Sequence, residues 1–169
     1  TSLPADITGA TRPIPEGGLV DMGAYEARSS GGTFLNVVFV KADAVGANDG
    51  GSWQDAFTDL QQALAHAQVD DEIWVAEGIY LPTATGDRTK SFTMRAGVLV
   101  FGGFVGTETA RDERNVREHP TILSGDIETS DNADNSYHVV QGTSNSRLDG
   151  FIIENGNANG MLAGQSAGG

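Results

Sequence analysis

Apolar and polar residues follow a different pattern at the start of the chain than in the rest of it. Residues 1–32 are rich in proline, glycine and small polar residues, with one short apolar stretch around residues 19–22. Such a segment can supply one or two strands but has no sufficient core of its own. We therefore predict two parts, a strand segment with a linker at 1–32 and a main domain at 33–169.

The main domain opens with a strand pattern followed by a helix pattern. Residues 33–46, TFLNVVFVKADAVG, contain an apolar run rich in β-branched residues, which is typical of a buried strand. Ser52, with Asp55 three positions later, resembles a capping box. We predict one α-helix over residues 52–68. Its apolar face has the three-and-four spacing of a helix and consists of Trp53, Ala56, Phe57, Leu60, Ala63, Leu64 and Ala67.

Short apolar strands that end in glycine repeat after the predicted helix. They end at Gly78, Gly102, Gly125, Gly142 and Gly156. A repeat of about 20 residues or more, built from a strand and a turn, is typical of a solenoid whose coils bury their inward side chains on one another. We predict an all-β fold, a short parallel β-helix capped by the helix at 52–68. An antiparallel sandwich with irregular loops has similar spacing and stays open as an alternative.

The charge and composition of the chain limit its partners. It has 23 acidic and 10 basic residues, for a formal net charge of −13 at pH 7. This charge repels phosphate backbones and anionic lipid surfaces, so we expect no nucleic acid partner. The chain has no cysteine, which excludes disulfides and thiolate zinc sites. No run of about 18 apolar residues occurs, so we expect no membrane insertion.

Several motifs between residues 39 and 160 carry a family resemblance. They are VFVKADAVGANDGGSWQDAFTDLQQALAHAQVDDEIWVAEGIYLPT, FGGFVGTET, TILSGDI, NSYHVVQG and LDGFIIENGNANG. Together they resemble the amino-terminal part of bacterial right-handed parallel β-helix proteins, the pectate-lyase-like group. The resemblance implies a right-handed β-helix from a large secreted or surface-anchored protein. Residues 6–26, DITGATRPIPEGGLVDMGAYE, resemble the closing segment of the same kind of β-helix.

This fold hosts lyases, hydrolases, adhesins and inert stalks, so function must be inferred from sites. A lyase of the resembled group would require calcium-binding carboxylates and an Arg or Lys base. A hydrolase would require carboxylates about 5 to 9.5 Å apart. The sequence indicates neither set, and we predict an extracellular or cell-surface structural or adhesive module with no catalytic residues. The alternatives are the amino-terminal part of a polysaccharide lyase or hydrolase, and a calcium-dependent glycan-binding module.

One loop, SGDIETSDNADNS, gathers several oxygen donors of the kind that calcium prefers. It lacks the spacing and the bidentate Glu of an EF-hand loop, so a solvated acidic turn is the simpler explanation. The candidate calcium ligands are Asp126, Glu128, Asp131 and Asp134.

Other residues that often carry chemistry have structural explanations. His66, His119 and His138 are scattered, and their context suggests no paired nucleophile. Trp53 belongs to the predicted helical face and Trp74 lies inside a predicted strand, so we expect both to pack in the core.

The two ends of the sequence complement each other in a way that predicts assembly. An open solenoid end is a template for strand addition, and residues 1–26 have strand-forming residues without a core. We predict head-to-tail association between copies of the chain, which need not close and would form a filament. The alternative is a longer tandem array in which both surfaces meet within one polypeptide. The predicted assembly residues are Ile7, Leu19, Val20, Met22 and Tyr25 on one copy, and Phe151, Ile152 and Ile153 on the next.

Overall fold

A computed structural model describes residues 36–129 and 131–160, and the structural statements below concern these residues. The chain divides into two units, Thr1–Gly32 and Thr33–Gly169, of which the first lies outside the described residues. The described elements are β1 (Val37–Val40), α1 (Leu60–His66), β2 (Glu72–Ala76), β3 (Gly78–Tyr80), β4 (Phe92–Thr93), β5 (Leu99–Phe104), the 3-10 helix η1 (Arg111–Glu113), β6 (Thr121–Ser124), β7 (Val140–Gln141), β8 (Arg147–Asp149) and β9 (Phe151–Glu154).

The strands form three parallel sheets, which confirms a predominantly β fold with a single α-helix in the described part. Sheet A has the order β1-β2-β5-β8, sheet B the order β3-β6-β9, and sheet C pairs β4 with β7. From β2 onward the chain therefore passes through sheets A, B and C in turn, passes through them again, and then returns to A and B. All described strand pairs are parallel, so the antiparallel sandwich that the spacing left open is wrong.

The α-helix is much shorter than the predicted range 52–68, and it starts after Asp59 instead of Ser52. Ser52 and Asp55 do bond to each other, with the Asp55 amide donating to Ser52 Oγ at 3.1 Å, but these bonds close a turn. Phe57 is in extended backbone, because its amide donates to the Phe39 carbonyl and its carbonyl accepts from the Lys41 amide, both at 2.9 Å. Pairing with β1 thus excludes Phe57 from the helix.

α1 itself begins with a good cap. The Asp59 carboxylate accepts the Gln61 amide at 2.8 Å, which satisfies one of the free donors at the helix start. The buried face of the helix is Leu60, Ala63 and Leu64, so the apolar spacing predicted the correct face over this shorter range.

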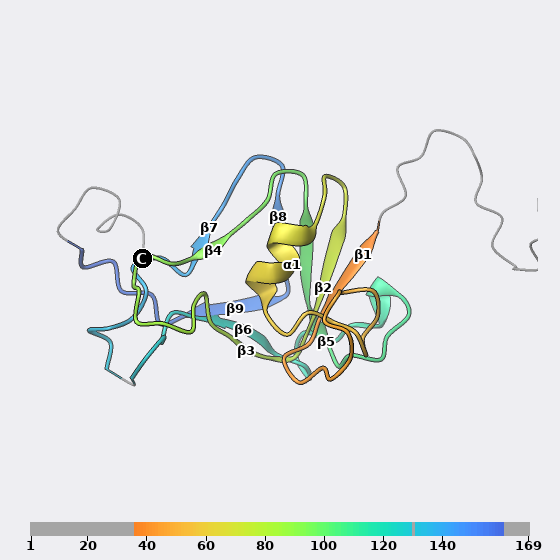
Figure 1. Ribbon diagram of the computed structural model, residues 1–169, viewed down its shortest axis with the longest axis horizontal. Coiled ribbons are helices and arrows are strands. Elements are labelled where there is room, and N and C mark those ends of the chain that lie inside the picture. The colour runs from red at the N-terminus through yellow and green to blue at the C-terminus, as the bar shows by residue number, and fades with distance from the viewer. Residues whose placement is uncertain (1–35, 130, 161–169) are drawn as a thin grey trace, which may run out of the picture. The chain divides into compact units, whose positions relative to one another are not determined.

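The three sheets and α1 share one hydrophobic core. Figure 1 shows α1 in front of the space that the sheets surround, with sheet A on one side, sheet C on another and sheet B below. Inward side chains stack in columns across paired strands; in sheet A, Val38, Ile73 and Val100 form one such column and all three are buried. The helix packs against β1 and β4, which are the first strands of sheets A and C.

Candidate functional site

The last strands of the three sheets, β7, β8 and β9, form what we call the open edge. Each pairs with an earlier strand on one side, and no strand of the described residues pairs with its other side. In sheet B the inward residue Leu123 is 0% exposed, whereas Ile153, its partner in β9, is 53% exposed. The same loss of burial separates the last two members of the columns in sheets A and C, which are Val100 and Leu148, and Phe92 and Val140.

The structure places three of the predicted assembly residues at this open edge. Phe151, Ile152 and Ile153 all belong to β9, whose paired side faces β6. Phe151 is partly buried and packs on the core, whereas Ile152 is 48% exposed. The other five predicted assembly residues, Ile7, Leu19, Val20, Met22 and Tyr25, lie outside the described residues.

A cavity of about 370 Å³ opens between β7 and β9 at the open edge. Its walls are residues 138–140, which include the first residue of β7, and residues 153–156, which include the end of β9. Ile153 and Val140, the last members of two inward columns, both line it. The open edge therefore has a recess of mixed polar and apolar lining as well as three strand edges.

Two arginines bond to Asp149 of β8, and one of them, Arg114, also reaches the neighbouring strand β5. Arg114, which follows η1, donates from Nη1 to the carbonyls of Gly102 and Asp149 at 3.1 and 3.2 Å, and from Nη2 to Asp149 Oδ1 at 2.5 Å. Arg147 donates to the other carboxylate oxygen of Asp149 at 2.5 Å. Hydrogen bonds from Arg147 and Arg114 hold the pKa of Asp149 below its usual value. Arg114 thus connects β5 to β8, the strand at the open edge.

An aromatic cluster covers the outer face of sheet A. Trp74 and Phe101 are strand partners whose neighbours Ile73 and Val100 face the core, so the two aromatic rings face the other way. Trp74 stacks on Phe104 with ring centroids 4.9 Å apart, and Trp53 lies 5.6 Å from Phe104. Trp74 is buried in this second hydrophobic core cluster, as predicted, and Trp53 packs against it. The helical position predicted for Trp53 is wrong, because α1 begins only at Leu60.

Three arginine side chains converge on the edge of that cluster. The guanidinium groups of Arg111, Arg114 and Arg147 lie 4.8, 5.1 and 5.5 Å from the centre of the Phe101 ring, within cation–π range. Glu72, which is buried, accepts from Arg111 at 2.5 Å and from the Trp74 indole at 2.8 Å. None of these arginines stands out in the sequence, because only the pairing of β2, β5 and β8 brings them together.

Another carboxylate that the sequence did not single out closes the turn after β5. Glu108 accepts the amides of Val105, Gly106 and Thr107 at 2.6 to 2.9 Å. Burial raises the pKa of Glu108, but these backbone hydrogen bonds outweigh it and leave the pKa below its usual value. The hydrogen bonds of its carboxylate are all local, which indicates a structural role.

The predicted calcium ligands lie in the loop between β6 and β7. Asp134 Oδ2 accepts from the amide and the hydroxyl of Thr129 at 3.0 and 2.5 Å, and Asp131 Oδ1 accepts from the Ala133 amide at 3.0 Å. Asp126 donates its amide to Ser124 Oγ. The Glu128 carboxylate lies beside Gly86, which belongs to the loop between β3 and β4.

This loop gives limited geometric support for calcium. Asp134 Oδ1 is buried and has no hydrogen-bond partner. Within residues 36–129 and 131–160, however, no group of three or more His, Asp or Glu side chains could hold a metal ion. Calcium binding stays a prediction.

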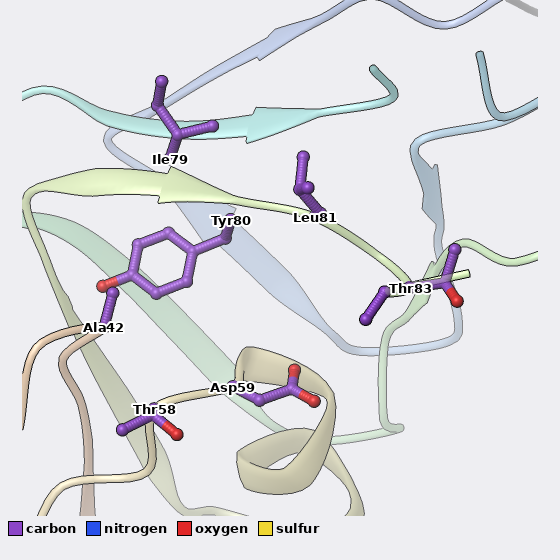
Figure 2. A pocket seen from close by; sticks show the side chains of 8 residues that line it. Ala42, Thr58, Asp59, Ile79, Tyr80, Leu81 and Thr83 are labelled. Carbon is purple, nitrogen blue, oxygen red and sulfur yellow. The ribbon is translucent and has the colours of Figure 1, made fainter. Parts of the chain in front are cut away.

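A second recess, of about 240 Å³, lies beside the start of α1 (Figure 2). Figure 2 shows Ile79 and Leu81 on one side of the chain and the Tyr80 ring on the other, turned toward Ala42. The Tyr80 hydroxyl donates to the Ala76 carbonyl at 3.1 Å, and its burial raises the pKa of the phenol. Asp59 is already engaged as the helix cap. The residues that line this recess therefore provide no pair of side chains that could act as a catalytic acid and base.

Comparison of the chain with models of protein families, with curated proteins and with solved structures finds no match. None of the helices in the described part is long and apolar enough to cross a membrane.

Proposed function

We propose that the protein is an extracellular structural or adhesive module, in which residues 37–154 form the first coils of a right-handed parallel β-helix. Three features support this. The chain visits sheets A, B and C in a repeating order, the strand pairs are parallel, and inward apolar residues stack in columns. A solenoid produces these features together, because each coil packs only on its neighbours.

The loss of burial at the open edge carries the functional part of the proposal. Leu148, Phe151 and Ile153 each pair with a fully buried residue of the neighbouring strand, yet each keeps part of its apolar surface exposed. Covering apolar surface stabilises an assembly by about 25 cal/mol per Å². Further coils at this edge, from a neighbouring copy or from a tandem domain, would bury that surface. A module that extends by adding coils suits a filament or a surface array.

The arrangement of charged residues supports a structural role over catalysis. The arginines on sheet A are engaged with Glu72, Asp149 and backbone carbonyls, so none is free to act as a base beside a bound sugar. The alternative with one favourable observation is calcium-dependent glycan binding, because Asp134 Oδ1 is buried without a partner. That alternative requires binding which a chelator abolishes and which yields no product.

Incubation with a panel of acidic and neutral polysaccharides tests the proposal against both alternatives. We expect no new unsaturated or reducing ends, and no binding that depends on calcium. Sedimentation of the full chain over a range of concentrations should reveal open-ended oligomers. Product formation would contradict the structural role, and a strictly monomeric protein at every concentration would contradict assembly.

A further inference from the structure

We infer that β9 accepts residues 20–22 of a second copy as an added parallel strand, with Val20 beside Phe151 and Met22 beside Ile153. This inference rests on the proposed function, because it needs the open edge to be the place where coils are added. It specifies the partner as another copy of this chain, and it specifies a register.

The edge of β9 has the properties that strand addition requires. β6 pairs with one side of β9 from Phe151 to Glu154, and on the opposite side no described strand is present. Half of the backbone N–H and C=O groups of a strand point to each side, so an unpaired edge is a template for another strand. Backbone pairing supplies affinity in such contacts, and alternate side chains supply specificity.

Inward and outward positions alternate along β9. Phe151 and Ile153 pair with the inward residues Thr121 and Leu123 of β6, both of which are fully buried. Ile152 pairs with Ile122 on the outward face. A strand added to β9 therefore needs apolar residues opposite Phe151 and Ile153, and tolerates a polar residue opposite Ile152.

Residues 19–25, LVDMGAY, meet this requirement in only one alternation. If Asp21 faced inward, an isolated carboxylate would be buried, at a cost of several kcal/mol. Asp21 must therefore face outward, which turns Val20 and Met22 inward. A shift of one residue would reverse every side chain, so Asp21 fixes the face of the added strand.

The cavity at the open edge favours Met22 at its assigned position. Ile153 is one of the residues that line the cavity of about 370 Å³, so the side chain placed beside Ile153 adjoins this space. Methionine is unbranched and has three rotatable bonds, so it can adapt to the apolar part of this wall, which is Val139, Val140 and Ile153. The same insertion would cover the exposed surface of Ile153. Repeated from copy to copy, this contact is heterologous and builds an open filament.

Engineered cysteines test the register directly, because the chain has none of its own. Full-length copies that carry Asp21→Cys are mixed with full-length copies that carry Ile152→Cys under mild oxidation. Adjacent strands lie about 4.8 Å apart, within the Cα range of a disulfide. We expect a mixed-disulfide dimer that contains one copy of each variant. In the matched control, Leu19→Cys replaces Asp21→Cys; it faces the same way but lies about 7 Å farther along the strand, and the yield should fall at least fivefold.

A double variant in one copy separates this inference from the proposed function. Ile122 and Ile152 are strand partners, so Ile122→Cys with Ile152→Cys should form an intramolecular disulfide. If this disulfide forms but the Asp21→Cys mixture stays uncrosslinked, the inference is refuted and the parallel coils stand. If it does not form, the proposed fold and the inference fail together. Equal crosslinking of Leu19→Cys and Asp21→Cys would refute the register. Crosslinking that appears only after residues 161–169 are deleted would show that the chain's own tail occupies the edge, which also overturns the inference.

Discussion

The first and last strands of the three sheets form two edges that differ in what covers them. At the edge made by the first strands, α1 packs on β1 and β4 and adds Leu60 and Leu64 to the core. At the open edge, no described element takes that place, and Ile153 is 53% exposed although Leu123, beside it in the same column, is completely buried. The position of the strand in its sheet, and not the residue type, therefore decides how far these apolar side chains are buried.

The polar contacts at the two edges also differ: those at the first edge hold the covering helix in place, and those at the open edge join strands of one sheet. The helix is tied to sheet C through Gln61, which donates to the Ser91 carbonyl at 2.5 Å, and through Arg95, which donates to the Ala65 carbonyl at 2.9 Å. At the open edge, Arg114 connects β8 to β5, its neighbour in sheet A. The edge of the first strands is thus covered by the helix, whereas β8 at the open edge is only bonded to the neighbouring strand of its own sheet.

The largest effect should separate Leu123 from Ile153. Leu123→Ala removes a fully buried side chain and should cost about 2 to 5 kcal/mol of unfolding free energy, because a cavity remains. Ile153→Ala removes a half-exposed side chain and should cost less than about 1 kcal/mol in the monomer. Urea unfolding at low protein concentration measures both. Equal losses would mean that the open edge is covered in the monomer.

Arg114 should be the next most important residue. Arg114→Ala removes three hydrogen bonds to Gly102 and Asp149, including one between opposite charges, and should cost about 1.5 to 3 kcal/mol. The change should also raise amide hydrogen exchange in β8 more than in β2. Arg117→Ala is the matched control, since Arg117 is exposed on the same loop, and should change stability by less than about 0.5 kcal/mol. Uniform exchange in both strands would argue against a local anchor.

A smaller effect is expected at the helix-covered edge. Asp59→Ala removes the side-chain acceptor of the Gln61 amide and should cost about 1 kcal/mol. Loss of protection should appear in α1 while β8 and β9 stay unchanged, as hydrogen exchange can measure. Asp112→Ala changes an exposed carboxylate elsewhere and provides the control. An effect that spreads equally to β9 would contradict the independence of the two edges.

The smallest effect concerns pH and Asp149. Its pKa is lowered in the folded protein by hydrogen bonds from Arg147 and Arg114. The resulting stabilisation is fully present above the unfolded pKa of about 3.9 and is lost as the pH falls through the lower folded value. Stability measured from pH 6 to pH 2 should therefore decline less steeply in Asp149→Asn than in the unaltered protein. Identical slopes would show that this carboxylate does not contribute to the acid sensitivity of β8.

Part of the fold was predictable because strand patterns and glycines are local signals. The strands β6 and β7 end immediately before Gly125 and Gly142, as the sequence indicated. The sequence also pointed to Phe151–Ile153 as a strand, which β9 confirms. By contrast, β4 has only two residues and β8 only three. Neither is long enough to show the alternation of apolar and polar residues that predicts a strand. They are strands because neighbouring strands pair with them.

Local signals in the sequence therefore predict the β-rich character, the apolar face of the helix and the location of β9. Tertiary pairing decided the rest. Phe57 has the spacing of a helical residue, yet its hydrogen bonds to β1 keep it extended. Arg114 and Asp149 are far apart in the chain, and they meet only because β8 lies beside β5. Exposure at the open edge follows from the stack as well, because a side chain is buried only where another element packs over it.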